Sequence, residues 1–154
     1  MSRPSWDEYF MRMAFLASER STCMRRKVGA VLVKENQILA TGYNGAPKGL
    51  KHCQELGYCN REKLKVPTGE RNDICRAAHA EANSIAQAAK HGVSIDGAKL
   101  YSTNFPCSFC LRLILNSGIE EIIYCDEYFD EISKEILKDA NIKTRQFKLK
   151  HSED

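Results

Sequence analysis

Four side chains, in two short stretches of the chain, could together bind a metal ion and move a proton. His79 and Glu81 lie in the first stretch, and Cys107 and Cys110 lie in the second. One imidazole and two thiolates are typical zinc ligands, and three protein ligands leave the fourth tetrahedral position open for water, as catalytic zinc sites require. We therefore predict a catalytic zinc site with His79, Cys107 and Cys110 as its ligands.

Glu81 is predicted to transfer protons rather than to bind the metal. Residues i and i+2 point to different faces of a helix, so this carboxylate is not expected to coordinate zinc beside His79. It could instead take a proton from the water, pass it to a ring nitrogen, and help an amino group leave as ammonia. This chemistry is the deamination of a base, and H-x-E followed by P-C-x-x-C is typical of zinc-dependent base deaminases.

Helix starts are expected to position these groups. Cys107 and Cys110 are three residues apart, so both sulfurs would project from the first turn of a helix that Pro106 opens. Free N–H groups and the positive end of the helix dipole favour thiolates there. The alanine-rich stretch that carries the H-x-E motif predicts a helix over 77–91, which ends at Gly92.

The remaining patterns alternate between strand and helix. A hairpin is expected in the first half, and helices alternating with strands in the second half require parallel pairing. The expected helices cover 6–20, 77–91, 107–117 and 132–140, and the expected strands cover 28–33, 37–42, 99–103, 119–124 and 143–149. We predict an α/β fold, a three-layer αβα sandwich with a mixed five-stranded sheet and helices on both faces.

Composition indicates one soluble domain over residues 1–154, with 43% hydrophobic and 28% charged residues. No apolar run has the length of a membrane-spanning helix, and the first residues lack a signal-peptide pattern. We expect a cytoplasmic protein in which the seven cysteines are reduced. The net charge of +3 is spread along the chain, so neither a membrane nor an extended nucleic-acid surface is expected.

A second metal site is a further prediction. Residues 50–73 show no sustained hydrophobic period, and long irregular loops in compact domains are usually functional or stabilised by an additional interaction. The cysteines in and around this segment are Cys23, Cys53, Cys59 and Cys75. They could form a four-thiolate structural zinc site, with His52 as a substitute ligand. Their irregular spacing is also that of scattered buried thiols, so both interpretations stay open.

The chain resembles deoxycytidylate (dCMP) deaminases of the cytidine-deaminase superfamily from about Trp6 to Phe147. The matching blocks, in the order of the family, are 27–31, 42–45, 79–81 and 105–107. The resemblance implies a cytidine-deaminase-like fold and zinc-dependent hydrolysis of dCMP to dUMP and ammonia, which supplies dUMP for thymidylate synthesis. The cysteine-rich loop resembles the branch of the family that carries a second, structural zinc.

The resemblance also implies substrate contacts. Asn44 would bind the deoxyribose hydroxyl, Phe105 would face the base, and Tyr128 would lie near the 5′-phosphate. Arg26 or Lys27 would add positive charge there. Family members commonly bind dCTP as activator and dTTP as inhibitor near residues 44–49, with Mg²⁺ accompanying such a nucleotide effector, and many are homo-oligomers, often hexamers.

Two other functions are considered. A tRNA-adenosine deaminase or other polynucleotide deaminase shares both zinc motifs, but it typically has Glu in place of Phe105 and lacks the block at 42–45. A non-catalytic, zinc-stabilised interaction protein, such as an accessory factor in DNA uptake or processing, is the other. Glu81 argues against it, because a structural zinc site has no use for an unliganded carboxylate.

Overall fold

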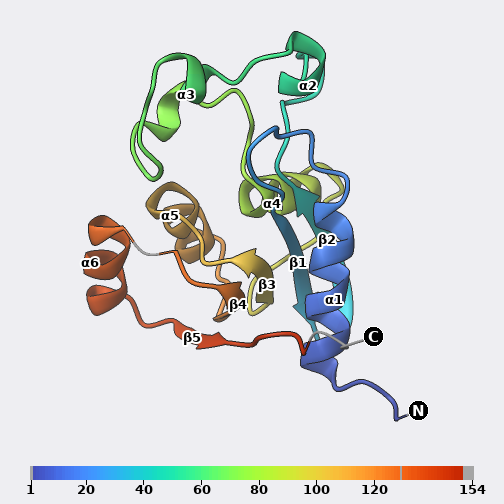
Figure 1. Ribbon diagram of the computed structural model, residues 1–154. Coiled ribbons are helices and arrows are strands. Elements are labelled where there is room, and N and C mark those ends of the chain that lie inside the picture. The colour runs from blue at the N-terminus through green and yellow to red at the C-terminus, as the bar shows by residue number, and fades with distance from the viewer. Residues whose placement is uncertain (1, 129, 151–154) are drawn as a thin grey trace.

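A mixed five-stranded sheet lies at the middle of the structure, a computed structural model that describes residues 2–128 and 130–150 (Figure 1). The strands are β1 (Gly29–Lys34), β2 (Gln37–Tyr43), β3 (Lys99–Asn104), β4 (Glu121–Asp126) and β5 (Lys143–Gln146). The helices are α1 (Trp6–Ser18), α2 (Cys53–Leu56), α3 (Asn60–Lys63), α4 (Ala80–Lys90), α5 (Ser108–Asn116) and α6 (Glu131–Asp139), and a 3₁₀ turn, η1, covers Asn72–Ile74.

The strand order is β2-β1-β3-β4-β5. The hairpin β1–β2 is antiparallel and β3 joins β1 antiparallel, whereas β3, β4 and β5 are parallel to one another. The parallel part follows from the chain order, because α5 connects β3 to β4 and α6 connects β4 to β5. The predicted hairpin and the predicted parallel pairing are both confirmed.

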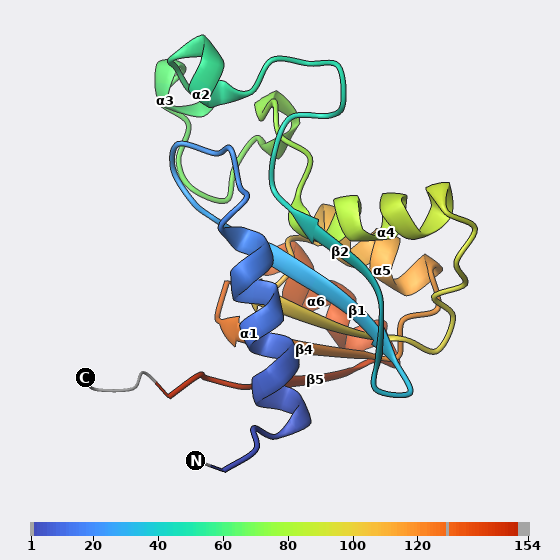
Figure 2. The same ribbon diagram turned by 90° about the vertical axis from the view of Figure 1, so that its right-hand side faces the viewer.

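Helices cover both faces of the sheet, which confirms the predicted three-layer αβα arrangement. In Figure 2, α1 crosses one face, while α4, α5 and α6 lie behind the sheet. Alternate strand residues separate into two cores: Val31 and Ile123 pack with α1, whereas Leu32 and Ile122 pack with α4 and α5. The chemistry-bearing helix starts therefore belong to the same layer.

Helix boundaries differ slightly from the predicted ones. The helix expected from residue 77 begins at Ala80, because Ala78 still pairs with Gly45 as an isolated β-bridge and His79 is an extended N-cap. The helix expected from residue 107 begins at Ser108, with Cys107 as its N-cap. Both metal-ligand motifs thus lie at the boundary between an extended segment and a helix.

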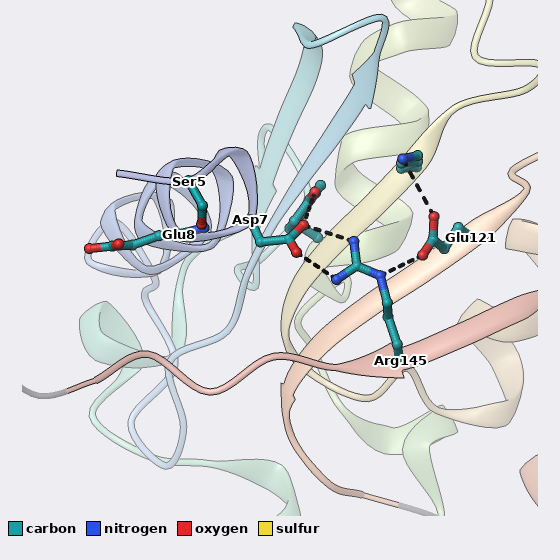
Figure 3. Close-up of polar contacts among 7 residues, drawn as sticks. Ser5, Asp7, Glu8, Glu121 and Arg145 are labelled. Atoms are coloured by element: carbon teal, nitrogen blue, oxygen red, sulfur yellow. Dashed lines mark hydrogen bonds and ion pairs between the residues drawn. The ribbon is translucent and has the colours of Figure 1, made fainter. Parts of the chain in front are cut away.

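An ion-pair network joins the start of α1 to the edge strand β5 (Figure 3). Arg145 donates to both carboxylate oxygens of Asp7, at 2.6 and 2.8 Å, and to Glu121 at 2.7 Å. The Tyr101 hydroxyl also donates to Asp7. These contacts hold the first helix against the last strand across the sheet face.

The segment expected to be irregular contains two helices of four residues each, α2 and α3, and the turn η1. One helical turn is too short to show a hydrophobic period, so its sequence pattern could not reveal it. These elements lie beyond the end of the sheet in Figures 1 and 2. Within residues 2–128 and 130–150, no helix has both the length and the apolar character needed to cross a bilayer.

Candidate functional site

His79, Cys107 and Cys110 come together as predicted, in one cluster whose ligand atoms all lie within 4.8 Å of one another. Both sulfurs face the same ring nitrogen: the Nδ1 atom of His79 lies 3.3 Å from Cys107 Sγ and 3.6 Å from Cys110 Sγ. Tetrahedral ligands of a zinc ion are about 3.5 Å apart when the bonds are about 2.0–2.3 Å. The three side chains therefore have the composition and spacing that zinc requires.

Close packing on the sheet sets the position of α4 and its N-cap. Gly42 in β2 leaves room for this approach, since a Cβ there would lie 2.2 Å from the Ala80 carbonyl oxygen and 2.6 Å from the Ser84 amide nitrogen. Ala80 itself is fully buried. The location of His79 thus depends on a backbone contact between β2 and the first turns of α4.

The three side chains of the ligand cluster differ in how their pKa values are shifted. A hydrogen bond from Cys110 and the nearby His79 lower the pKa of the Cys107 thiol to about 4, while that same hydrogen bond and burial raise the pKa of Cys110. The Cys107 sulfur raises the pKa of His79. Zinc binds thiolates and neutral imidazole, so a zinc ion would displace the remaining protons.

Glu81 is almost fully buried in the first turn of α4, beside the cluster but not part of it. The Ser102 hydroxyl of β3 donates to Glu81 Oε1 at 3.0 Å. Burial raises the pKa of Glu81, because a low-dielectric environment disfavours the charged carboxylate. Sequence reasoning missed Ser102, which lies 21 residues from its partner and has no local motif.

A cavity of about 220 Å³ opens beside the cluster, with His79, Glu81 and Cys107 in its wall. Asn44 and Phe105, for which contacts to the deoxyribose and the base were predicted, also line it. This volume has room for one small molecule.

Asn44 and Phe105 both have internal contacts as well. The Asn44 side chain accepts from the Val28 amide at 2.9 Å and donates to the Arg26 carbonyl at 2.8 Å. Phe105 is 2% exposed and packs edge to face on Tyr124. Each residue is therefore held firmly in the cavity wall.

Tyr128 and Arg26 meet at another part of the same wall. The Arg26 guanidinium lies 5.5 Å from the centre of the Tyr128 ring. Lys27, the predicted alternative to Arg26, is exposed and is absent from the residues that line the cavity. Sequence reasoning missed Arg25, Arg61 and Arg76, which the fold brings to this cavity.

The four cysteines of the predicted second site also line this cavity: Cys23, Cys53, Cys59 and Cys75. Burial raises the pKa of the Cys53 and Cys75 thiols, and the neighbouring sulfurs raise that of Cys53 further. Among the described residues, His79, Cys107 and Cys110 are nevertheless the one group whose ligand atoms lie close enough together to share a metal ion. His52 Nδ1 lies 2.8 Å from Thr22 Oγ1, so its ring nitrogen already has a partner.

Comparison with known proteins identifies related chains. A family model described as "Cytidine and deoxycytidylate deaminase zinc-binding region" matches residues 4–126. The chain is 42% identical over 146 residues to a deoxycytidylate deaminase of Schizosaccharomyces pombe, covering 94% of this chain, and 43% identical over 132 residues to that of Mycobacterium phage D29, covering 82% of this chain. A solved dCMP deaminase of cyanophage S-TIM5, in complex with dCMP and dUMP, aligns with a TM-score of 0.75 and 31% identity over 96% of this chain and 100% of that chain.

These matches differ in how much of each relative they cover. The chain spans about half the length of the Schizosaccharomyces pombe protein, 45%, and of a deoxycytidylate deaminase of Saccharomyces cerevisiae to which it is also 42% identical, 46%, but it spans 99% of the phage protein. The range of the family model includes all three clustered ligands and Glu81. The chain therefore belongs to the family defined by the cytidine and deoxycytidylate deaminase zinc-binding region.

Proposed function

We propose that the chain catalyses the hydrolytic deamination of dCMP to dUMP and ammonia, supplying dUMP for thymidylate synthesis. The observation that carries this proposal is a buried carboxylate, Glu81, beside a three-ligand cluster at the wall of one cavity. A purely structural zinc site has four protein ligands and needs no such carboxylate. Family membership and the similarity to an enzyme solved with dCMP and dUMP support the substrate.

In this proposal His79, Cys107 and Cys110 hold the zinc ion. Zinc bound there would act as a Lewis acid that lowers the pKa of water toward neutrality. The two cysteines belong to the first turn of α5 and its N-cap, where backbone N–H groups stabilise thiolates. His79 contributes Nδ1, the nitrogen that faces both sulfurs.

Glu81 is proposed to carry the protons. Its carboxylate takes one proton from water and gives it to the ring nitrogen of cytosine as the C4–O bond forms. It then takes the second proton from the oxygen now on C4 and gives it to the amino group. The C4–N bond breaks, nitrogen leaves as ammonia, and the oxygen stays on C4 as the carbonyl of dUMP. Burial supports this role because it raises the pKa of Glu81. A carboxyl group with a raised pKa is more effective at both accepting and returning a proton near neutral pH. The Ser102 hydrogen bond orients one oxygen of the Glu81 carboxylate.

The rest of the cavity is proposed to bind the nucleotide. Asn44 would bind the deoxyribose hydroxyl and Phe105 would contact the base. Tyr128 and Arg26 would bind the 5′-phosphate, for which charge-assisted hydrogen bonds are the strong kind. The charge of the wall supports a phosphate, because its lining residues include four arginines and one carboxylate, that of Glu81.

A structural zinc held by Cys23, Cys53, Cys59 and Cys75 is a second part of the proposal. Its support is that these four sulfurs, from a segment that runs from residue 23 to residue 75, all line one cavity, where Cys53 interacts electrostatically with the other three. Zinc binding would bring them closer and order the segment between β2 and α4. His52 is the less favourable ligand, because Thr22 already contacts it.

Regulation and assembly are proposed from the family resemblance alone. On that basis dCTP, with Mg²⁺, would activate and dTTP would inhibit through residues 44–49. The protein would form a cytoplasmic homo-oligomer, with a hexamer as the assembly that the resemblance implies.

A deamination assay on zinc-replete protein tests the function. The panel is dCMP, dCTP, deoxycytidine, single-stranded DNA and tRNA, and we expect dCMP to have the highest kcat/KM. Deamination of DNA or tRNA with dCMP ignored would indicate a polynucleotide deaminase. Turnover of none of them by a zinc-loaded protein would favour a non-catalytic, zinc-stabilised interaction protein.

A further inference from the structure

Arg61 in α3 is a buried cation with an unusual set of partners. It is 7% exposed, and none of the ion pairs in the part of the chain that the structure describes includes it. Its guanidinium donates instead to three neutral oxygens: Pro67 O at 2.8 Å, Arg71 O at 3.0 Å and Asn72 Oδ1 at 3.2 Å. Burying a cation without a carboxylate is unfavourable, so these three hydrogen bonds are needed to offset the cost of burying Arg61.

All three acceptors belong to one loop, residues 64–72, which we call the clasped loop. Three of its residues have a left-handed backbone: Lys65 at φ 54°, Gly69 at 87° and Arg71 at 47°. Such conformations are unfavourable for residues other than glycine and persist only where the surroundings impose them. One planar guanidinium that bonds to the middle of the loop, at Pro67, and to its end, at Arg71 and Asn72, imposes this shape.

The tip of the clasped loop lies against Tyr128. Thr68 and Gly69 line the cavity, and a Cβ added at Gly69 would lie 2.5 Å from the Tyr128 hydroxyl oxygen. The Arg25 guanidinium donates to the Thr68 hydroxyl at 3.2 Å and so ties the loop to the segment before β1. The position of the loop therefore limits where the Tyr128 hydroxyl can lie.

We propose that Arg61 is a positioning residue, which sets the affinity of the cavity for the phosphate of its nucleotide by clasping loop 64–72 against Tyr128. This inference rests on the proposed dCMP deaminase function. The Arg61 guanidinium already donates three hydrogen bonds to the loop, so we do not assign it as a direct phosphate ligand. Without the clasp, binding would have to order the loop, which weakens affinity without changing the chemical step.

The variants Arg61→Gln and Arg61→Lys test the clasp in the full, zinc-replete chain. Gln removes both charge and fork, whereas Lys keeps the charge but lacks the planar fork. We expect both to raise the KM for dCMP about ten-fold, with kcat for dCMP and kcat/KM for deoxycytidine within about two-fold of the parent. Amide hydrogen exchange in residues 64–72 should become faster. Lys63→Gln, at an exposed position of the same helix, is the matched control and should behave as the parent.

The outcomes separate this inference from the proposed function. A parent protein that does not deaminate dCMP would reject the function, and hydrogen exchange would still decide whether Arg61 orders the loop. With an active parent, a parental KM in Arg61→Lys would overturn the inference, because charge alone would then suffice. An equal loss on dCMP and deoxycytidine would overturn it too. If Arg61→Gln does not fold, Asn72→Ala, which removes one acceptor, should raise the KM in the same selective way.

Discussion

The two walls of the cavity are built in different ways. The sheet wall consists of the starts of α4 and α5, which carry the metal-ligand cluster and Glu81 and rest on the sheet (Figures 1 and 2). The loop wall consists of residues 50–76, which include α2, α3 and the clasped loop. In the loop wall only Cys59 and Arg61 are buried, whereas the sheet wall shares the main core.

This difference separates chemistry from recognition. Hydrophobic packing against the sheet holds the reactive groups, so their geometry needs no ligand to form. Guanidinium hydrogen bonds and thiols hold the loop wall, and such a segment opens at a lower free energy than the core does. We therefore expect changes in the sheet wall to affect turnover, and changes in the loop wall to affect affinity and local order.

Glu81→Gln should give the largest effect. The amide keeps the size of the side chain but cannot accept and return a proton, so kcat should fall at least about 10²–10⁴-fold. Zinc content should remain that of the parent, because Glu81 lies outside the ligand cluster. Steady-state kinetics with metal analysis checks both. Near-parental activity in the zinc-replete variant would show that another group transfers the proton.

Gly42→Ala tests whether packing on the sheet sets the position of the ligands. The new methyl group would meet the backbone of α4, so we expect a loss of stability of about 1–3 kcal/mol and a lower kcat as His79 moves. Gly29→Ala is the matched control, because its methyl group would meet the backbone of α1 on the opposite face.

The control should lose stability but keep the parental kcat. Urea denaturation and kinetics of the two variants supply the comparison. Equal kcat in the two variants would mean that the contact between β2 and α4 does not position the ligands.

Cys75→Ser should reveal how the loop wall is held. If four thiolates bind a structural zinc, the metal content should fall from two ions to one. A stability loss of about 2 kcal/mol would lower the Tm by roughly 4–8 °C. The rate constant per folded, zinc-replete site should change much less. One zinc per chain in the parent, with an equally stable Cys75→Ser variant, would reject the second site and leave the first intact.

Tyr128→Phe should act on affinity alone. A hydrogen bond to a charged group contributes about 1.5 kcal/mol or more, so losing the hydroxyl should raise the KM for dCMP about ten-fold. Activity on deoxycytidine, which lacks the phosphate, should stay unchanged. A parallel loss on the two substrates would show that this hydroxyl does not bind phosphate.

Asp7→Asn should give the smallest effect. It should lower the free energy of unfolding at neutral pH and leave it unchanged at acidic pH. Hydrogen bonding to Arg145 lowers the pKa of Asp7 in the folded state. The stabilisation is therefore present above the pKa of Asp7 in the unfolded chain and is lost as the pH falls through its folded pKa. Urea midpoints of parent and variant should differ at pH 7, and the difference should disappear at acidic pH, once the pH is below the lowered pKa of Asp7 in the folded state.

Asp73→Asn is the matched control in the loop wall. Its partner is Arg71, and both side chains are mostly exposed. Exposed ion pairs contribute little to stability, so this variant should match the parent at both pH values. A difference between Asp7→Asn and the parent that persists at acidic pH would show that the network of Figure 3 acts through packing instead of charge.

The spacing of residues along the chain was enough to predict the five strands, the four longer helices and the clustered ligands. His79, Cys107 and Cys110 could be assigned because each lies at a helix start, where three or four residues determine the direction of a side chain. Alternating helix and strand patterns likewise predicted the parallel half of the sheet. These properties depend on local geometry, which a short stretch of sequence contains.

Only the tertiary structure decided which distant residues share the cavity. The bond from Ser102 to Glu81 requires β3 to approach the first turn of α4, and no motif marks either partner for the other. Arg61 lies in a single helical turn, which has no hydrophobic period, and its role follows from oxygens that the folded loop turns toward it. Such contacts depend on strand register and on packing between elements, and these emerge only when the whole chain has folded.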